Sequence, residues 1–200
     1  MLVKINSLHP QKRLIDQAVK VLEQGGTIIY PTDTIYGLGC DLFNKEAIEN
    51  IEKIKGRDKN QAKYFSFICH DLAHISDFAK VSTPNYKILK RLLPGPYTFI
   101  LPATKSVPKK IISQKHSVGI RIPDNQVALE LVKKLGRPII STSVNASNQP
   151  TLSDPEEINK LFGKRVDLIL DAGILEGEPS TIVDLTGPEP VIIRQGKGDF

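Results

Sequence analysis

The sequence alternates amphipathic segments with short apolar runs, and this alternation restricts the fold more than any other feature. Residues 10–24 carry apolar side chains at helical spacing, and Gly25-Gly26 ends that segment. The run Thr27–Tyr30 then has the apolar character of a buried strand, which Pro31 ends. Repetition of this pattern predicts an α/β (α+β) fold, in which helices flank one twisted mixed sheet.

The remaining segments continue the alternation. Helices are predicted over residues 44–54, 71–78, 83–93 and 127–135, and from residue 154 onward. Strands are predicted over residues 64–69, 97–101, 118–122, 166–170, 181–185 and 191–194, and from residue 139 onward. Thr83-Pro84 has the pattern of a helix cap followed by a first turn. Prolines and glycines mark no linker, so residues 1–200 are expected to form a single domain.

Charge and composition limit the ligand classes and the compartment. With 27 Lys and Arg against 22 Asp and Glu, the net charge of +5 suits nucleic acid or nucleotide phosphates. Trp is absent, which disfavours an aromatic platform for single-stranded bases. Cys40 and Cys69 make no CxxC pair, as is typical of reduced thiols in a cytosolic protein. The N-terminus lacks a signal-peptide pattern and no apolar run approaches roughly 18 residues, so a cytoplasmic location without membrane contact is expected.

Two polar clusters follow predicted elements. Lys55 and Arg57 flank Gly56 at the end of a helix, a combination that suits an anionic group such as phosphate. The alternative is a pair of solvated cations that favour the helix dipole. Ser141, Ser143 and Asn145 are instead spaced two apart after a buried strand begins. In an extended chain they would point to one side, and there they need hydrogen-bond partners.

A hydroxyl-rich loop and two arginines complete the candidate site. The loop Pro31–Gly39 follows a buried strand and could present Thr34 to a ligand. The alternative is a turn in which Asp33 and Thr34 bond local backbone. Arg121 lies within an apolar strand pattern, where its fork would suit a carboxylate, or it faces outward on a half-exposed strand. Arg194 repeats that pattern near the C-terminus.

Several catalytic motifs are absent from the sequence. It contains no P-loop, no G-x-S-x-G elbow, no H-E-x-x-H and no Rossmann glycine fingerprint. Any chemistry is therefore expected to depend on positioning and charge stabilisation rather than on a covalent intermediate.

The ordered motifs resemble those of the YrdC/YciO family. They are Gly25–Gly39, Lys55–Arg57, Leu93–Thr98, Val118–Pro123, Ser141–Asn145 and Ser180–Asp184. The resemblance implies a YrdC-like fold around a basic concave cleft. It also implies a nucleotidyltransferase that joins L-threonine, bicarbonate and ATP into threonylcarbamoyl-AMP and pyrophosphate, for N6-threonylcarbamoyladenosine modification of tRNA. Mg²⁺ would share the neutralisation of the phosphates.

The resemblance also assigns site residues. The catalytic cations would be Lys55 and Arg57. The threonine site would be formed by Thr34, Ser66, Arg121, Ser141 and Ser180. The ATP site would be formed by Lys55, Arg57, Gln61, Ser117, Ser143, Asn145, Thr151 and Arg194. No protein ligand set for a metal is predicted.

One motif differs from that of the family's synthases. They usually carry Asn-Pro-Leu-x-x-His after the Lys-x-Arg motif, whereas this chain has residues 61–66, with Ser66 in place of the histidine. This resembles the YciO branch, although that branch can lose the Lys-x-Arg and Ser-x-Asn elements that are kept here. The alternative function is a non-catalytic YciO-like module that binds double-stranded RNA or tRNA. Proteins of tRNA modification are further expected partners.

Overall fold

The computed structural model describes residues 1–56, 65–113, 115–145 and 150–200. Their strands are β1 (Leu2–Lys4), β2 (Ile28–Tyr30), β3 (Gly37–Gly39), β4 (Ser66–Ile68), β5 (Tyr97–Pro102), β6 (Ser117–Arg121), β7 (Ile139–Ser143), β8 (Leu168–Asp171), β9 (Thr181–Asp184) and β10 (Val191–Arg194). Their helices are α1 (Lys12–Glu23), α2 (Lys45–Ile54), α3 (Leu72–Phe78), α4 (Thr83–Leu92), α5 (Gln126–Leu135) and α6 (Pro155–Phe162).

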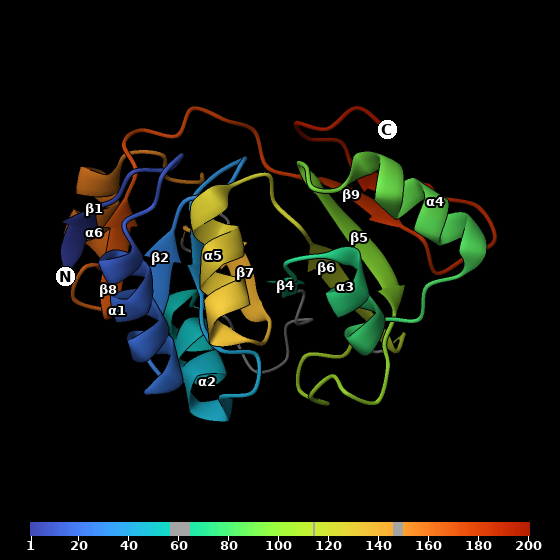
Figure 1. Ribbon diagram of the computed structural model, residues 1–200, viewed down its shortest axis with the longest axis horizontal. Coiled ribbons are helices and arrows are strands. Elements are labelled where there is room, and N and C mark those ends of the chain that lie inside the picture. The colour runs from blue at the N-terminus through green and yellow to red at the C-terminus, as the bar shows by residue number, and fades with distance from the viewer. Residues whose placement is uncertain (57–64, 114, 146–149) are drawn as a thin grey trace.

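The described strands form one sheet in the order β1-β8-β2-β3-β7-β4-β6-β5-β9-β10 (Figure 1). β8 pairs in parallel with β1 and β2, and β4–β6 and β5–β9 are also parallel. The other neighbouring pairs are antiparallel. The predicted mixed sheet with flanking helices is therefore confirmed.

Side-chain caps explain where most of the helices begin. Asn44 accepts a hydrogen bond from the Ala47 N–H at the start of α2, and Asn125 accepts one from Ala128 at the start of α5. The prediction that Thr83 caps α4 is wrong, because Thr83 is already helical and Ser82 is the cap. Gly136 ends α5 with a φ of 72°, a left-handed conformation that glycine adopts without strain.

The two faces of the sheet carry separate apolar clusters. α1 and α5 lie side by side over one face (Figure 1), where they pack on Ile28 and Tyr30. Ile29, the residue between them, points into the other cluster with side chains from α2 and α6. This division follows from the alternation of side chains along a strand.

Two short strands were not predicted. β1 has three residues, and β3 lies within the segment Pro31–Gly39, which we expected to be a loop. The two glycines of β3 lower its strand propensity, yet they allow close packing. A Cβ atom on Gly39 would lie 2.3 Å from the Ile140 carbonyl oxygen, so only glycine fits there.

Candidate functional site

Strand register gathers small polar residues on one face of the sheet. Ser66 of β4 pairs with Ser141 of β7 on one side and with Gly119 of β6 on the other. Paired residues point to the same face, so these three form a row across three strands. Ser143 lies two residues beyond Ser141 and pairs with Gly37 of β3, so it joins the same face. The Ser66 hydroxyl donates to the Ser141 carbonyl oxygen at 2.9 Å.

The polar row continues beyond Gly119. A Cβ atom on Gly119 would lie 3.4 Å from the Ser66 Cβ and 3.4 Å from the Thr98 Cγ2, so Gly119 lies between these side chains. The Thr98 hydroxyl is hydrogen-bonded to the Ser180 hydroxyl at 2.9 Å. The polar face, as we call it, therefore runs from Ser143 to Ser180 and joins segments far apart in the sequence.

Arg121 is buried on this face, two residues after Gly119. Its Nη2 donates to the Asp33 carboxylate at 2.9 Å and to the Thr34 hydroxyl at 3.0 Å. Burial lowers the pKa of the Arg121 guanidinium, while the Asp33 charge acts against that shift. Its Nε is buried and has no hydrogen-bond partner among the described residues. The outward-facing alternative for Arg121 is therefore wrong.

The loop before β3 is arranged around this arginine. The Thr32 hydroxyl accepts the Thr34 N–H at 3.1 Å and donates to the Ile35 carbonyl at 2.6 Å, which fixes the Thr34 backbone. The second oxygen of the Asp33 carboxylate accepts the Asp124 N–H at 3.1 Å. The sequence assigned Asp33 a contact only in the alternative turn, to local backbone, and did not predict its pairing with Arg121. The sequence feature that could have indicated this pair is the single acid of the loop together with an arginine inside an apolar strand.

Arg194 is held against Ser180. Its Nη2 and Nε donate to the Ser180 carbonyl oxygen at 2.6 and 3.2 Å. Partial burial lowers the pKa of Arg194, and the positive charge of Arg121 lowers it further. The resemblance placed Arg194 with ATP, and the structure joins it to a residue assigned to threonine.

Lys55 brings the other polar cluster to the same face. It follows α2, is only 2% exposed, and donates from Nζ to the Ser143 carbonyl oxygen at 2.9 Å. Its Nζ also bonds the Asn145 side-chain oxygen, which the Ser143 hydroxyl contacts at 2.7 Å. The alternative of a solvated helix-end cation is therefore wrong for Lys55. The following Gly56 has a φ of 63°, which turns the chain here.

The remaining predicted residues lie at the margins of this site. Ser117 begins β6 and its hydroxyl is 2.8 Å from that of Ser113. Thr151 precedes Leu152, whose N–H donates to the Val144 carbonyl at 3.1 Å, so Thr151 lies beside the end of β7. The predicted residues Arg57 and Gln61 lie outside the described part of the chain.

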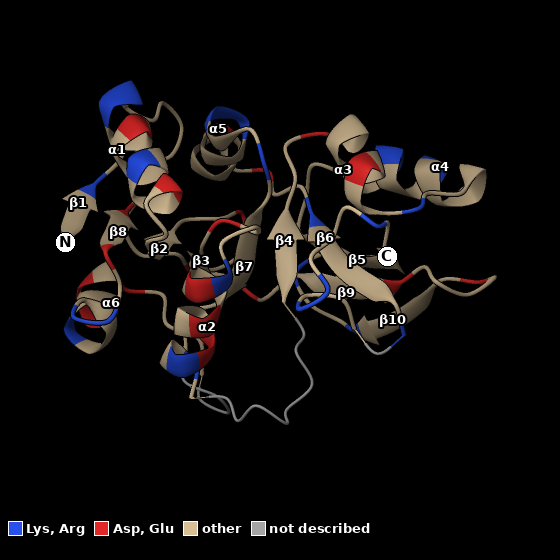
Figure 2. Ribbon diagram, turned by 90° about the horizontal axis from the view of Figure 1, so that it is seen from below, with Lys and Arg blue, Asp and Glu red and all other residues tan. Residues whose placement is uncertain are grey.

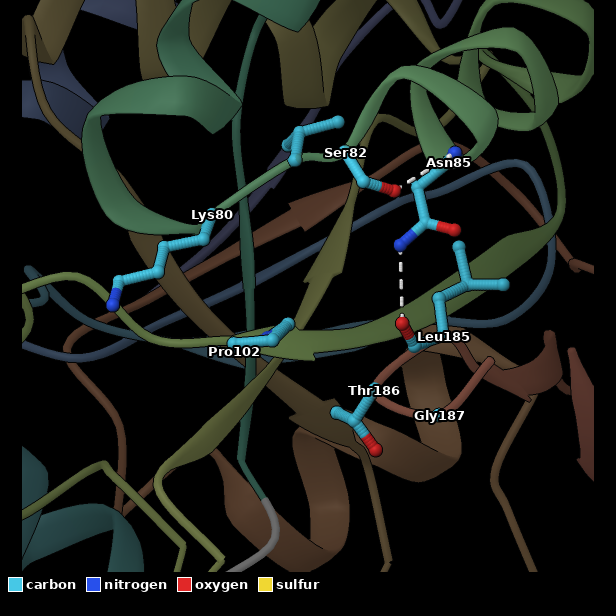
Figure 3. Close-up of a pocket in the computed structure, with 8 residues that line it drawn as sticks. Lys80, Ser82, Asn85, Pro102, Leu185, Thr186 and Gly187 are labelled. Carbon is cyan, nitrogen blue, oxygen red and sulfur yellow. Dashed lines mark hydrogen bonds between the residues drawn. The ribbon is translucent and has the colours of Figure 1, made fainter. Parts of the chain in front are cut away.

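Other features of the surface lie elsewhere. A pocket of about 410 Å³ is lined by Lys80, Ser82, Asn85 and Thr186 among others (Figure 3). It lies at the end of β9 opposite Ser180 and contains none of the residues predicted for the site.

Figure 2 shows Lys and Arg on several helices with acidic residues interspersed on α1, α2 and α6. None of the helices in the described ranges is long and apolar enough to cross a membrane.

A family model described as telomere recombination, for Sua5, YciO and YrdC proteins, matches residues 20–196. The chain belongs to the Sua5/YciO/YrdC family. Within this family it is 42% identical to the uncharacterized protein YciO of Escherichia coli, over 96% of this chain and 93% of YciO. It is also 36% identical to the threonylcarbamoyl-AMP synthase of Coxiella burnetii, over 78% of this chain and 84% of the synthase. The resemblance found in the sequence is confirmed.

Solved structures of the Sua5/YciO/YrdC family share the fold. The crystal structure of E. coli YciO matches with a TM-score of 0.94 at 40% identity, and the match covers 100% of this chain and 97% of YciO. Pyrococcus abyssi Sua5 complexed with L-threonine matches with a TM-score of 0.91 at 28% identity. That match covers 98% of this chain but 57% of Sua5, which is the longer protein.

Proposed function

We propose that this chain is a threonylcarbamoyl-AMP synthase-like enzyme. It would condense L-threonine, bicarbonate and ATP into threonylcarbamoyl-AMP and pyrophosphate, as a nucleotidyltransferase that serves tRNA modification. One observation carries the proposal. A single polar face of the sheet brings together a buried lysine beside Ser143 and a buried arginine on β6 that is paired with a carboxylate.

The arginine end suits an amino acid. Within the described ranges the Arg121 Nε has no hydrogen-bond partner, and a guanidinium fork matches the two oxygens of a carboxylate. The hydroxyls of Thr34, Ser141 and Ser180 would contact the polar atoms of threonine, with Ser66 beside Ser141. The complex of Sua5 with L-threonine supports this choice of ligand, because a member of the family at 28% identity shares the fold.

The lysine end suits a triphosphate. Lys55 would neutralise phosphate charge, together with Arg57 and Arg194, while polar contacts to ATP would come from Gln61, Ser117, Ser143, Asn145 and Thr151. The described residues contain no group of three or more His, Cys, Asp or Glu side chains that could hold a metal. Mg²⁺ would therefore enter with the phosphates of ATP.

The chemistry needs orientation and charge stabilisation. The threonine amine and bicarbonate would form a carbamate with loss of water. A carbamate oxygen would then attack the α-phosphorus of ATP, and the electron pair of the broken P–O bond would leave on pyrophosphate. Lys55 and Arg57 would stabilise the negative charge that develops on this leaving group.

Pyrophosphate release tests the proposal. We expect release that requires threonine, bicarbonate and ATP together, and that Arg57→Ala abolishes. Release that is independent of threonine, or unchanged in Arg57→Ala, would contradict it.

RNA binding stays a prediction from the net charge of +5. Affinity for double-stranded RNA that falls steeply with salt, without consumption of ATP, would favour that alternative.

A further inference from the structure

The last residues of the chain return to the site. After β10, residues 195–200 form a segment that we call the C-terminal strap. It lies against the start of β9, where the Lys197 N–H donates to the Pro179 carbonyl at 3.0 Å. The Thr181 hydroxyl accepts the Gly196 and Gly198 N–H groups at 3.0 and 3.1 Å, and donates to the Gly198 carbonyl at 2.6 Å. Hydrogen bonds of its own backbone therefore hold the strap against Pro179 and Thr181.

Glycine is required on both sides of Lys197. A Cβ atom on Gly196 would lie 2.1 Å from the Pro179 carbonyl oxygen, and one on Gly198 would lie 2.5 Å from the Tyr97 ring. The Tyr97 hydroxyl also donates to the Asp199 carbonyl at 2.7 Å. These close contacts hold the Lys197 backbone against the segment that carries Ser180.

The Lys197 side chain crosses from the strap to the loop around Arg121. Its Nζ donates to the Asp33 carbonyl oxygen at 2.7 Å. The Asp33 carboxylate in turn binds Arg121, and the next residue, Thr34, accepts from the same arginine. Lys197 thus connects the two halves of the proposed threonine site, one directly before β9 and one before β3.

The positive charge of Lys197 would also attract a ligand carboxylate to the site around Arg121 and Ser180. Asp33 compensates the charge of Arg121 before any ligand binds. Two further cations of the described chain lie at this end, because Arg194 donates to the Ser180 carbonyl and Lys197 to the Asp33 carbonyl. A ligand carboxylate would be attracted by these two cations as well as by the fork of Arg121.

We propose that Lys197 is a positioning residue for the amino-acid substrate. It holds the Asp33-Thr34 backbone at a set distance from Ser180, so that hydroxyls from both halves can contact one threonine molecule. The inference rests on the proposed function, because it takes the ligand at this end to be an amino acid.

Calorimetric titration of L-threonine and of ATP tests this role in Lys197→Met, which removes the ammonium but keeps most of the stem. We expect threonine to bind about three- to tenfold more weakly, as for loss of one hydrogen bond, and ATP affinity to change less than about twofold. Lys197→Arg should restore threonine binding because it keeps a charged donor. Lys164→Met, at an exposed lysine in the turn after α6, is the matched control and should behave as wild type.

Hydrogen exchange of the amides at residues 32–36 supplies a readout that is independent of substrate. Lys197→Met should exchange faster there, and Lys197→Arg should not. If wild type binds no threonine but the loop still loosens in Lys197→Met, the proposed function fails, and with it the assignment of an amino-acid ligand. If wild type binds threonine and Lys197→Met changes neither affinity nor exchange, the positioning role alone is overturned.

Discussion

Two neighbouring rows of residues lie side by side across β7, β4 and β6 and have opposite characters. Ile140, Phe67, Ile120, Phe99 and Val183 are paired across β7, β4, β6, β5 and β9, and each is fully buried. One residue away along β7, β4 and β6, the paired residues are Ser141, Ser66 and Gly119. The apolar row packs into the core, whereas the adjacent row is small and polar on the opposite face.

This difference separates stability from ligand binding within single strands. The hydrophobic effect requires the apolar row for folding, because burial of such side chains is the main favourable contribution. Small polar residues contribute little to that term, and they place hydroxyl groups on the other face. We therefore expect substitutions one position apart to fail in different assays.

The largest effect is expected from Phe67→Ala. Loss of this fully buried ring should lower the free energy of unfolding by about 3–5 kcal/mol, because a cavity remains in the apolar row. Urea denaturation measures the change. Its neighbour Ser66→Ala is the matched control and should cost only about 1 kcal/mol, as for one hydrogen bond. Equal costs at the two positions would show that the faces do not differ as described.

Next in size is Lys55→Met, which tests the lysine end of the polar face. Pyrophosphate release should fall roughly 100-fold, because a cation that stabilises the leaving group is lost. Threonine affinity should stay within about threefold of wild type. Lys53→Met, at an exposed lysine two residues earlier on α2, should leave release within about twofold. A normal rate in Lys55→Met would remove Lys55 from the proposed machinery.

Arg121→Lys should have a smaller effect, confined to the amino-acid end. The charge is kept, but the planar guanidinium is lost together with the Nη2 that binds Asp33 and Thr34. Threonine should therefore bind about 10- to 100-fold more weakly in calorimetry. Arg91→Lys, on the exposed surface of α4, should bind threonine as wild type does. Unchanged affinity in Arg121→Lys would place the carboxylate of the ligand elsewhere.

The smallest effect concerns Tyr36, which packs in the apolar cluster. Its hydroxyl donates to the Gly173 carbonyl at 2.7 Å and accepts the Ala172 N–H at 2.9 Å. Burial raises the pKa of Tyr36 to about 12, above the ordinary 10, so its contribution to stability is complete below pH 10 and decreases as pH rises toward 12. Tyr36→Phe should cost about 1 kcal/mol at neutral pH. The difference from wild type in urea unfolding should shrink between pH 10 and 12, and a constant difference would contradict the assignment.

The sequence predicted the helices and the main strands because their signals are local. Apolar spacing and capping side chains such as Asn44 and Asn125 mark α2 and α5 without reference to the rest of the chain. β3 was missed because its two glycines are poor strand formers, and their value lies in close packing that only the folded sheet reveals. The Ser82 cap was missed because Thr83 offered an equally good local signal.

The candidate site was predictable as a set of residues but not as an arrangement. Alternation indicated that Ser141 and Ser143 point to one side, yet only strand register shows that Ser66 and Gly119 continue their row. The pairing of Asp33 with Arg121 joins residues 88 positions apart, so no local pattern could reveal it. Lys197 was missed for the same reason.

The central claim is that the polar face holds an amino acid and a triphosphate side by side. A crystal structure with L-threonine and a non-hydrolysable ATP analogue tests it most directly. The account predicts the threonine carboxylate at Arg121, its other polar atoms at Ser141 and Ser180, and phosphates near Lys55. Ligands bound elsewhere, for example in the pocket beside Lys80 and Asn85, would contradict it.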